Sequence, residues 1–91
     1  MMRLDNKVAI VTGAGRGIGR AIALAYGQKG ARLSLVSRTE PEIRETADLI
    51  AAEGSCPVTI EADISKPDEV DLVVDRTVEA FGTVDILVNN A

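Results

Sequence analysis

The alternation of apolar and polar positions divides the chain into four short apolar runs separated by longer amphipathic segments. The runs are rich in β-branched residues and are bounded by glycine or polar residues, which predicts strands. They cover residues 7–12, 32–37, 57–63 and 85–90. The chain is therefore expected to supply four strands.

The three segments between these runs repeat their apolar residues at helical spacing. In the first, the apolar side chains fall at i, i+3, i+4, i+7 and i+8, so one face is expected to turn inward. That face is Ile18, Ala21, Ile22, Ala25 and Tyr26, and the helix is expected to end near Gly30. The other two helices are predicted to begin at capping boxes and to end at glycines, over residues 39–54 and 65–82. The box pairs are Thr39 with Glu42 and Ser65 with Asp68.

Strands that alternate with helices indicate a parallel sheet, because each parallel pair needs a crossover connection. Right-handed crossovers place helices on both faces of the sheet. We therefore expect an α/β fold, a Rossmann-type doubly wound parallel sheet with strand order 3-2-1-4. Residues 1–91 are interpreted as the N-terminal part of one such domain. Ligands of these sheets bind at the carboxyl ends of the strands, where the strand order reverses.

Charge and composition narrow the possible functions. The formal net charge of −4 speaks against binding to nucleic acid or to an anionic membrane surface. The absence of histidine and the single cysteine, Cys56, exclude His-based triads, an internal disulfide and multi-cysteine metal sites. No apolar run approaches the length of a membrane span, and the N-terminal residues are too polar for a signal peptide. The expected location is cytoplasmic, with no metal bound.

The segment TGAGRGIGR, residues 12–20, joins the first strand to the first helix with four glycines. Glycine permits positive φ and lets a ligand approach the backbone without a Cβ in the way. The following helix offers free N–H groups and the positive end of its dipole, which suits a phosphate. The loop is therefore interpreted as a pyrophosphate cradle rather than a bare turn. Its expected cofactor-binding residues are Gly13, Gly15, Arg16, Gly17, Ile18 and Gly19.

The glycine spacing is TGxxxGxG, formed by Thr12, Gly13, Gly17 and Gly19, and the last strand ends in NNA, residues 89–91. Together with the order of the elements, these motifs resemble the short-chain dehydrogenase/reductase family. The segments VAIVTGAGRGIGRAIA and FGTVDILVNNA look most like 3-oxoacyl-acyl-carrier-protein reductases and related alcohol or sugar dehydrogenases. The resemblance covers the whole chain but only the first third or so of a typical member.

The resemblance implies hydride transfer between a nicotinamide cofactor and a small-molecule carbonyl or alcohol substrate, in a parent protein that is a homo-oligomer. Members of the family use a tyrosine as acid/base, with a lysine four residues later and a serine upstream. The only tyrosine here is Tyr26, expected in the core, and Lys29 follows it by three residues. No catalytic residue is therefore identified in this segment.

The residue at the end of the second strand decides which nicotinamide cofactor is expected. NAD-binding proteins usually carry an acidic residue there, which accepts from the ribose 2′-OH. This chain has Ser37 followed by Arg38, and Arg16 lies in the glycine loop. Arginines can pair with the 2′-phosphate of NADP, so NADP(H) is predicted over NAD(H). The alternative is that both arginines are solvated surface charges.

The resemblance also implies cofactor contacts after the third and fourth strands. Asp63 matches the residue that contacts the adenine, with the backbone of Ile64 beside it, and Asn90 and Ala91 match ribose-side contacts. Asp63 could instead be an ordinary turn residue.

Three interpretations of the whole chain stay open. It is the NADP(H)-binding portion of a reductase, a non-catalytic nucleotide-binding module, or one half of a split protein completed by a partner chain. If the 91-residue chain exists alone, it is expected to be inactive and marginally stable.

Overall fold

The computed structural model describes residues 4–90, which alternate between strands and helices along the chain. The strands are β1 (Val8–Thr12), β2 (Arg32–Ser37), β3 (Val58–Glu61) and β4 (Ile86–Val88), and the helices are α1 (Gly17–Gln28), α2 (Glu40–Ala51) and α3 (Pro67–Phe81). The strands form one sheet in the order β3-β2-β1-β4, and every pair is parallel. The predicted fold class and strand order are confirmed.

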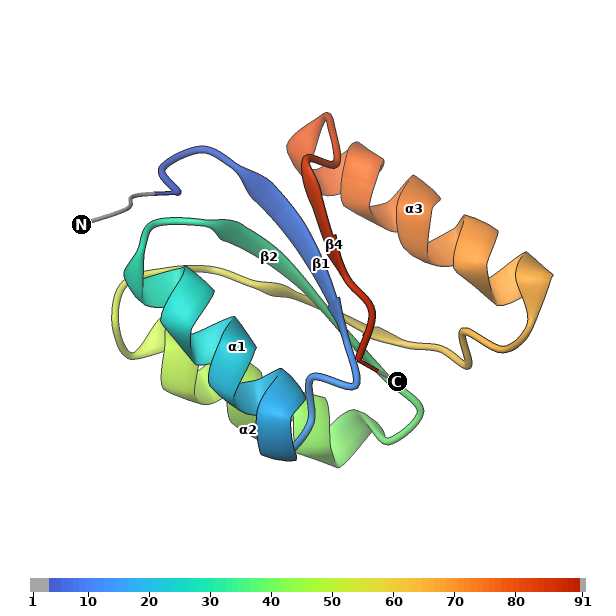
Figure 1. Ribbon diagram of the computed structural model, residues 1–91, viewed down its shortest axis with the longest axis horizontal. Helices are drawn as coiled ribbons and strands as arrows, with labels where there is room; N and C mark the ends of the chain where they lie inside the picture. Colours follow the sequence, from blue (N-terminus) through green and yellow to red (C-terminus); the bar gives the residue numbers. More distant parts are fainter. Residues whose placement is uncertain (1–3, 91) are drawn as a thin grey trace.

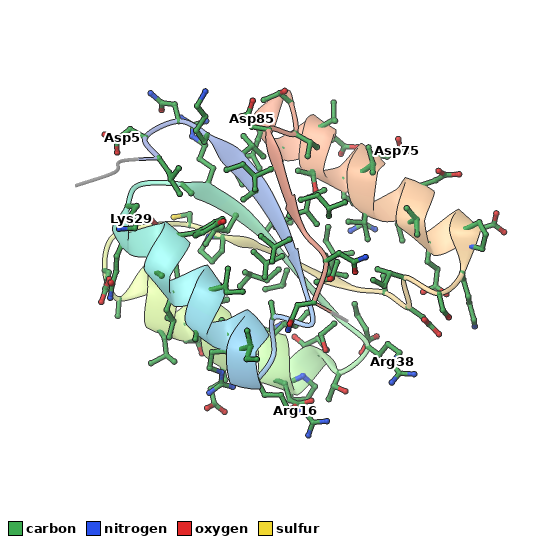
Figure 2. The ribbon with its side chains drawn as sticks, viewed as in Figure 1. Asp5, Arg16, Lys29, Arg38, Asp75 and Asp85 are labelled. Carbon is green, nitrogen blue, oxygen red and sulfur yellow. The ribbon has the colours of Figure 1, made fainter. Side chains whose placement is uncertain are left out.

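The sheet lies between two helix layers. Helices α1 and α2 cover one face and α3 covers the other, while β4 lies beside β1 at one edge (Figure 1). Side chains fill the space between the sheet and the helices (Figure 2). Because β1 contacts both layers, all five of its residues are buried. This explains why its sequence is apolar without alternation.

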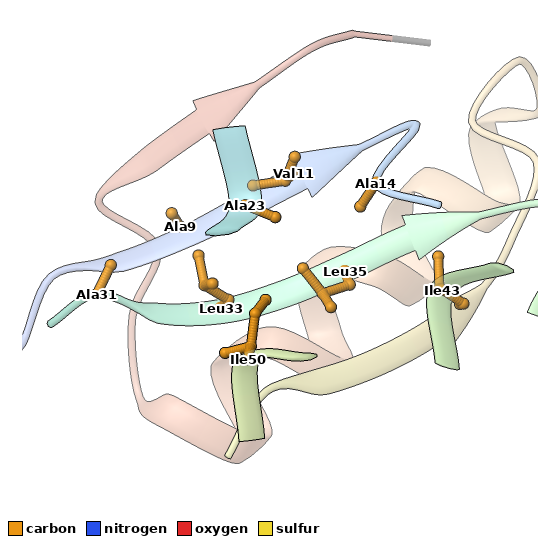
Figure 3. Packing of buried hydrophobic residues seen from close by; sticks show 9 residues of the cluster. All are labelled: Ala9, Val11, Ala14, Ala23, Ala31, Leu33, Leu35, Ile43 and Ile50. Carbon is orange, nitrogen blue, oxygen red and sulfur yellow. The ribbon is translucent and has the colours of Figure 1, made fainter. Parts of the chain in front are cut away.

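Two apolar clusters form the core, one on each face of the sheet. The cluster under α1 and α2 contains Ala9 and Val11 of β1, and Leu33 and Leu35 of β2 (Figure 3). The cluster under α3 contains Ile10, Val36 and Ile60. Neighbouring residues of β1 therefore point to opposite faces, as the period of a strand requires.

A buried polar contact joins α3 to the sheet. Thr77 Oγ1 lies 2.8 Å from Ser34 Oγ of β2 and 2.8 Å from the carbonyl oxygen of Val73. Both Thr77 and Ser34 are fully buried. Because each hydroxyl has a partner, the contact avoids the desolvation cost that an unpaired hydroxyl would carry.

The predicted inward face of α1 is largely wrong. The fully buried residues of α1 are Gly19 and Ala23, whereas Ile18 is 70% exposed. Ala21 and Ala25 are also exposed, while Tyr26 is half-buried against the core as expected. Gly19 is small because a Cβ there would collide with the Gly13 carbonyl oxygen of the glycine loop, and Ala23 packs in the core cluster under α1 and α2.

The two predicted capping boxes are also wrong. Thr39 and Lys66 occupy the N-cap positions of α2 and α3, and neither side chain makes a capping hydrogen bond. Ser65 donates its hydroxyl to Asp63 Oδ1 at 2.7 Å instead. Ser65 lies one residue before the N-cap, so it is not in the position from which a capping side chain accepts a helix amide. At the start of α2, the Glu40 amide donates to Glu61 Oε2 of β3 at 3.2 Å.

Candidate functional site

A cavity of about 720 Å³ lies at the carboxyl ends of the strands. Its walls come from the glycine loop, the end of β2 with the start of α2, the turn after β3, and the end of β4. The lining residues are Thr12, Gly13, Gly15, Arg16, Gly17, Val36, Ser37, Arg38, Thr39, Glu42, Ala62, Asp63, Ile64, Ser65, Asn89 and Asn90. The cavity therefore lies where a doubly wound sheet binds its ligand.

Three glycines shape the loop at the floor of this cavity, for two different reasons. Gly13 and Gly17 have φ of +62° and +58°, a conformation that L side chains rarely adopt. Gly19 has an ordinary φ, but a Cβ there would collide with the Gly13 carbonyl oxygen. The first reason is backbone conformation and the second is close packing of α1 against the loop.

The N-terminus of α1 is left open toward this loop. Its N-cap residue, Arg16, makes no side-chain capping bond, and the first turn contains no acidic residue. The first amides of a helix lack intrahelical acceptors and form the positive end of the dipole. This arrangement can hold the oxygens of a phosphate.

The loop is held from behind by neighbouring side chains. The Gly15 carbonyl oxygen accepts from Arg20 Nε at 3.1 Å and from Arg20 NH2 at 2.6 Å. Arg20 NH1 also pairs with Glu45 Oε1 of α2 at 2.9 Å. The Ala14 carbonyl oxygen accepts from the buried hydroxyl of Thr46 at 2.9 Å. Carbonyl oxygens of the loop are thus engaged by α1 and α2.

Thr12 joins the glycine loop to the end of β4. Its Oγ1 donates to the Val88 carbonyl oxygen at 3.2 Å and accepts from the Asn90 amide at 2.9 Å. Asn90 in turn lies against Gly13, where a Cβ would come within 3.1 Å of the Asn90 carbonyl oxygen. The TGxxxGxG motif and Asn90 of the NNA motif are therefore in direct contact in the folded chain.

Two arginines line the cavity at the end of β2. Arg16 extends from the glycine loop and Arg38 follows Ser37, on the side of the molecule opposite Asp5 and Lys29 (Figure 2). Both are exposed. The Ser37 hydroxyl accepts from the Thr39 amide at 3.1 Å, so it supports the turn that carries Arg38.

Asp63 lies in the turn that follows β3. Its Oδ1 accepts from the Ser65 hydroxyl at 2.7 Å and from the Ser65 amide at 2.9 Å. The hydroxyl bond, then the amide bond, lowers the pKa of Asp63 below its ordinary value, with a smaller contribution from the charges of Arg38 and Lys66. Because both bonds use Oδ1, the carboxylate can offer Oδ2 to a ligand donor.

The structure brings most of the predicted cofactor residues into this cavity. Nine of them line it: Gly13, Gly15, Arg16, Gly17, Ser37, Arg38, Asp63, Ile64 and Asn90. Gly19 lies buried beneath the loop, and Ile18 is exposed at the start of α1 without lining the cavity. Ala91 lies outside the described residues.

The sequence interpretation missed Glu42. Its spacing predicts a capping box, but Glu42 lines the cavity, with Oε2 3.7 Å from Arg16 Nε. Sequence spacing gives little sign of this, because the contact depends on how α2 lies against the glycine loop.

The only tyrosine of the chain lies away from the cavity. Tyr26 packs against the core instead of lining it. Among residues 4–90 there is no group of three or more side chains that could hold a metal ion. No helix in the same range is long and apolar enough to cross a membrane. The cavity has the parts of a nucleotide-binding site.

The sequence profile described as short chain dehydrogenase matches residues 7–91. The chain belongs to the short-chain dehydrogenase family. An uncharacterized oxidoreductase of Mycobacterium tuberculosis is 47% identical over 90 residues. The match covers 99% of this chain and 34% of the length of that protein. A versicolorin reductase of Emericella nidulans is 49% identical over 90 residues, and that match covers 98% of this chain and 34% of the reductase. This short-chain dehydrogenase chain thus spans about a third of the length of these relatives.

A shorter relative also exists. A short-chain dehydrogenase/reductase homolog of Bacillus subtilis is 42% identical over 91 residues, and the match covers 84% of that protein. Among solved structures, a short-chain type dehydrogenase/reductase from Mycobacterium marinum superposes with a TM-score of 0.95 at 37% identity, over 98% of this chain and 36% of that one. A short-chain dehydrogenase/reductase from Burkholderia phymatum, solved in complex with NAD, superposes with a TM-score of 0.94 at 38% identity. That match covers 100% of this chain and 32% of the other.

Proposed function

We propose that this short-chain dehydrogenase chain is the NADP(H)-binding portion of an oxidoreductase that transfers hydride between nicotinamide and a carbonyl or alcohol substrate. The observation that carries the proposal is the pair Arg16 and Arg38, which line one cavity at the end of β2. The position that commonly holds an acidic residue in NAD-binding sheets is Ser37. Two guanidinium groups attract a 2′-phosphate, whereas a bare 2′-hydroxyl gains little from them.

The remaining contacts follow from the chemistry of each wall. The open N-terminus of α1 and the glycine loop would hold the pyrophosphate. Asp63 Oδ2 would accept from the adenine amino group, and the end of β4 at Asn90 would lie beside a ribose. Bound nicotinamide supplies the hydride chemistry, and the residues of this chain supply binding and orientation.

We further propose that the acid/base residues come from outside these 91 residues. The only tyrosine, Tyr26, packs against the core, and the longer relatives extend over about three times this length. On this proposal the isolated chain binds cofactor but does not turn over substrate. The proposed similarity to 3-oxoacyl-acyl-carrier-protein reductases rests only on the segments VAIVTGAGRGIGRAIA and FGTVDILVNNA. A cytoplasmic location and a homo-oligomeric parent protein are parts of the same proposal.

A second candidate is a nucleotide-binding module without catalysis, or half of a split protein. The observation that favours it is the Bacillus subtilis homolog, of which the match covers 84%. The coding sequence downstream of Ala91 discriminates the two. A serine and a Tyr-x-x-x-Lys motif there support the enzyme, and a stop codon supports the second candidate.

Calorimetric titration of the chain with NADPH and NADH tests the cofactor. We expect NADPH to bind at least tenfold more tightly, since two charge-assisted contacts are lost with NADH. Arg38→Asp is expected to abolish the difference by replacing an attractive charge with a repulsive one. Equal affinities in the wild type, or an unchanged preference in Arg38→Asp, contradict NADP(H) as the cofactor.

A further inference from the structure

Glu42 places a negative charge in the same cavity as the two arginines. It belongs to the first turn of α2 and lines the cavity together with Arg16 and Arg38. Its side chain is 33% exposed, and Oε2 lies 3.7 Å from Arg16 Nε. Because the N-cap residue Thr39 makes no side-chain capping bond, Glu42 is not part of the capping box that its spacing predicts. Its carboxylate instead pairs with Arg16 at the wall of the cavity.

The position of Glu42 is fixed by the packing of α2 on the glycine loop. A Cβ on Gly15 would come within 2.7 Å of the Glu42 Cβ, so the Gly15 backbone packs directly against the Glu42 side chain. One turn later, Thr46 donates to the Ala14 carbonyl oxygen at 2.9 Å. These contacts hold the start of α2 against the loop, so the backbone and Cβ of Glu42 stay beside the cavity.

We propose that Glu42 is a specificity-determining residue that weakens the preference of the cavity for a 2′-phosphorylated cofactor. This inference rests on the proposed function. A carboxylate repels a phosphate dianion in the same cavity and also competes with it for the Arg16 guanidinium. An unphosphorylated ribose carries no such charge, so its binding is little affected. The effect of Glu42 therefore falls on the ratio of the two affinities.

Repulsion outweighs any help that Glu42 gives by orienting Arg16. The Arg16 side chain is 85% exposed, and its 3.7 Å contact is longer than the roughly 2.8 Å of a charge-assisted hydrogen bond. Such a pair orders an arginine only weakly. The charge of the carboxylate persists whatever conformation Arg16 takes.

The test measures binding of adenosine 2′,5′-bisphosphate and of 5′-AMP, two probes that differ only in the 2′-phosphate. Glu42→Gln removes the charge and keeps the shape, and Asp48→Asn removes an equal charge from an exposed residue of α2 that does not line the cavity. We expect Glu42→Gln to tighten the bisphosphate by roughly three- to fivefold at low salt, with the gain shrinking at high salt. Binding of 5′-AMP should stay the same, and Asp48→Asn should change neither.

The outcomes separate this inference from the proposed function. A wild-type chain without preference for the bisphosphate contradicts NADP(H) as the cofactor, whatever Glu42→Gln does. A wild-type preference that Glu42→Gln leaves unchanged or lowers, or that Asp48→Asn raises equally, overturns the role of Glu42 alone. Weaker binding of 5′-AMP to Glu42→Gln also overturns it, because the carboxylate would then be an acceptor for the ribose. Thermal unfolding of each variant verifies that the fold is retained.

Discussion

The glycines of the loop differ in what they contribute, and substitution separates them. Gly17 has a left-handed backbone, and no atom lies within 4 Å of where its Cβ would be. Gly19 has no conformational requirement, but its Cβ would collide with the Gly13 carbonyl oxygen and come within 2.8 Å of Asn90 Nδ2. The same sequence motif thus combines a backbone requirement with a packing requirement.

We predict that Gly17→Ala lowers the free energy of unfolding by about 1–2 kcal/mol, the cost of a left-handed alanine. Gly17→Asn should recover part of this loss, because asparagine tolerates that conformation. Gly19→Ala should cost more than Gly17→Ala, and Gly19→Asn should recover nothing, because α1 must move off the loop. Urea unfolding of the four variants measures these differences. Equal losses at the two positions would contradict the assignment.

The hydrogen bonds of Asp63 predict a pH dependence of stability. Its pKa is lower in the folded chain than the ordinary value of 3.8. The stabilisation is therefore fully present above about pH 4 and is lost as the pH falls through the folded pKa. Asp63→Asn should be less stable than the wild type at pH 6, and the difference should shrink toward pH 3. A difference that is constant between these pH values would contradict the prediction. Urea unfolding at both values measures it.

At the scale of elements, the packing of α1 on α2 supports the glycine loop. Arg20 of α1 reaches both the Gly15 carbonyl oxygen and Glu45 of α2. Its side chain is only 25% exposed, so these bonds are partly shielded from water. The loop is therefore held by an arginine that does not itself line the cavity.

We predict that Arg20→Met loosens the loop, lowering NADPH affinity severalfold and the free energy of unfolding by about 1–3 kcal/mol. Arg20→Lys should recover the charge but not the two-pronged contact, and thus little of the affinity. Arg44→Met is the matched control, because Arg44 pairs with Glu40 on the exposed surface of α2 at 2.6 Å. A control that loses as much affinity as Arg20→Met would contradict the special role of Arg20.

The succession of elements was predictable because apolar runs and glycines mark it, although β3 and β4 are shorter than the predicted runs 57–63 and 85–90. The order of the strands followed from their alternation with helices and from right-handed crossovers. The inward face of α1 was not predictable, since periodicity gives weight to bulky side chains while Gly19 and Ala23 make the close contact. The cavity at the strand ends was predictable from topology. The entry of Glu42 into it was not, because that depends on the packing of one helix against a loop 27 residues earlier, at Gly15.

At the scale of the whole molecule, apolar side chains remain uncovered on β4 and on α3. Leu87 of β4 is 64% exposed, and Val70, Val74 and Val78 of α3 are 40%, 41% and 43% exposed at helical spacing. Within the described residues, β4 pairs only with β1, so its other edge is open. An open strand edge and exposed apolar side chains each favour association with another chain.

We predict that the 91-residue chain self-associates at micromolar to millimolar concentration and that Leu87→Lys reduces this association, because an edge lysine opposes strand pairing. Leu49→Lys changes an apolar residue of α2 that is 46% exposed and should have little effect. Sedimentation velocity measures both variants. Equal reductions, or a wild-type chain that is monomeric throughout, would contradict the prediction.

The contact between Thr12 and Asn90 has a consequence for the order in which the molecule forms. Its partners are 78 positions apart, so a chain leaving the ribosome exposes the glycine loop long before the residue that completes it. Closing so large a loop is entropically costly, and such contacts tend to form late in folding. Cofactor should therefore slow unfolding and leave the folding rate nearly unchanged, which stopped-flow measurements with and without NADPH can determine. Cofactor binding is thus expected to stabilise the folded chain without accelerating its folding.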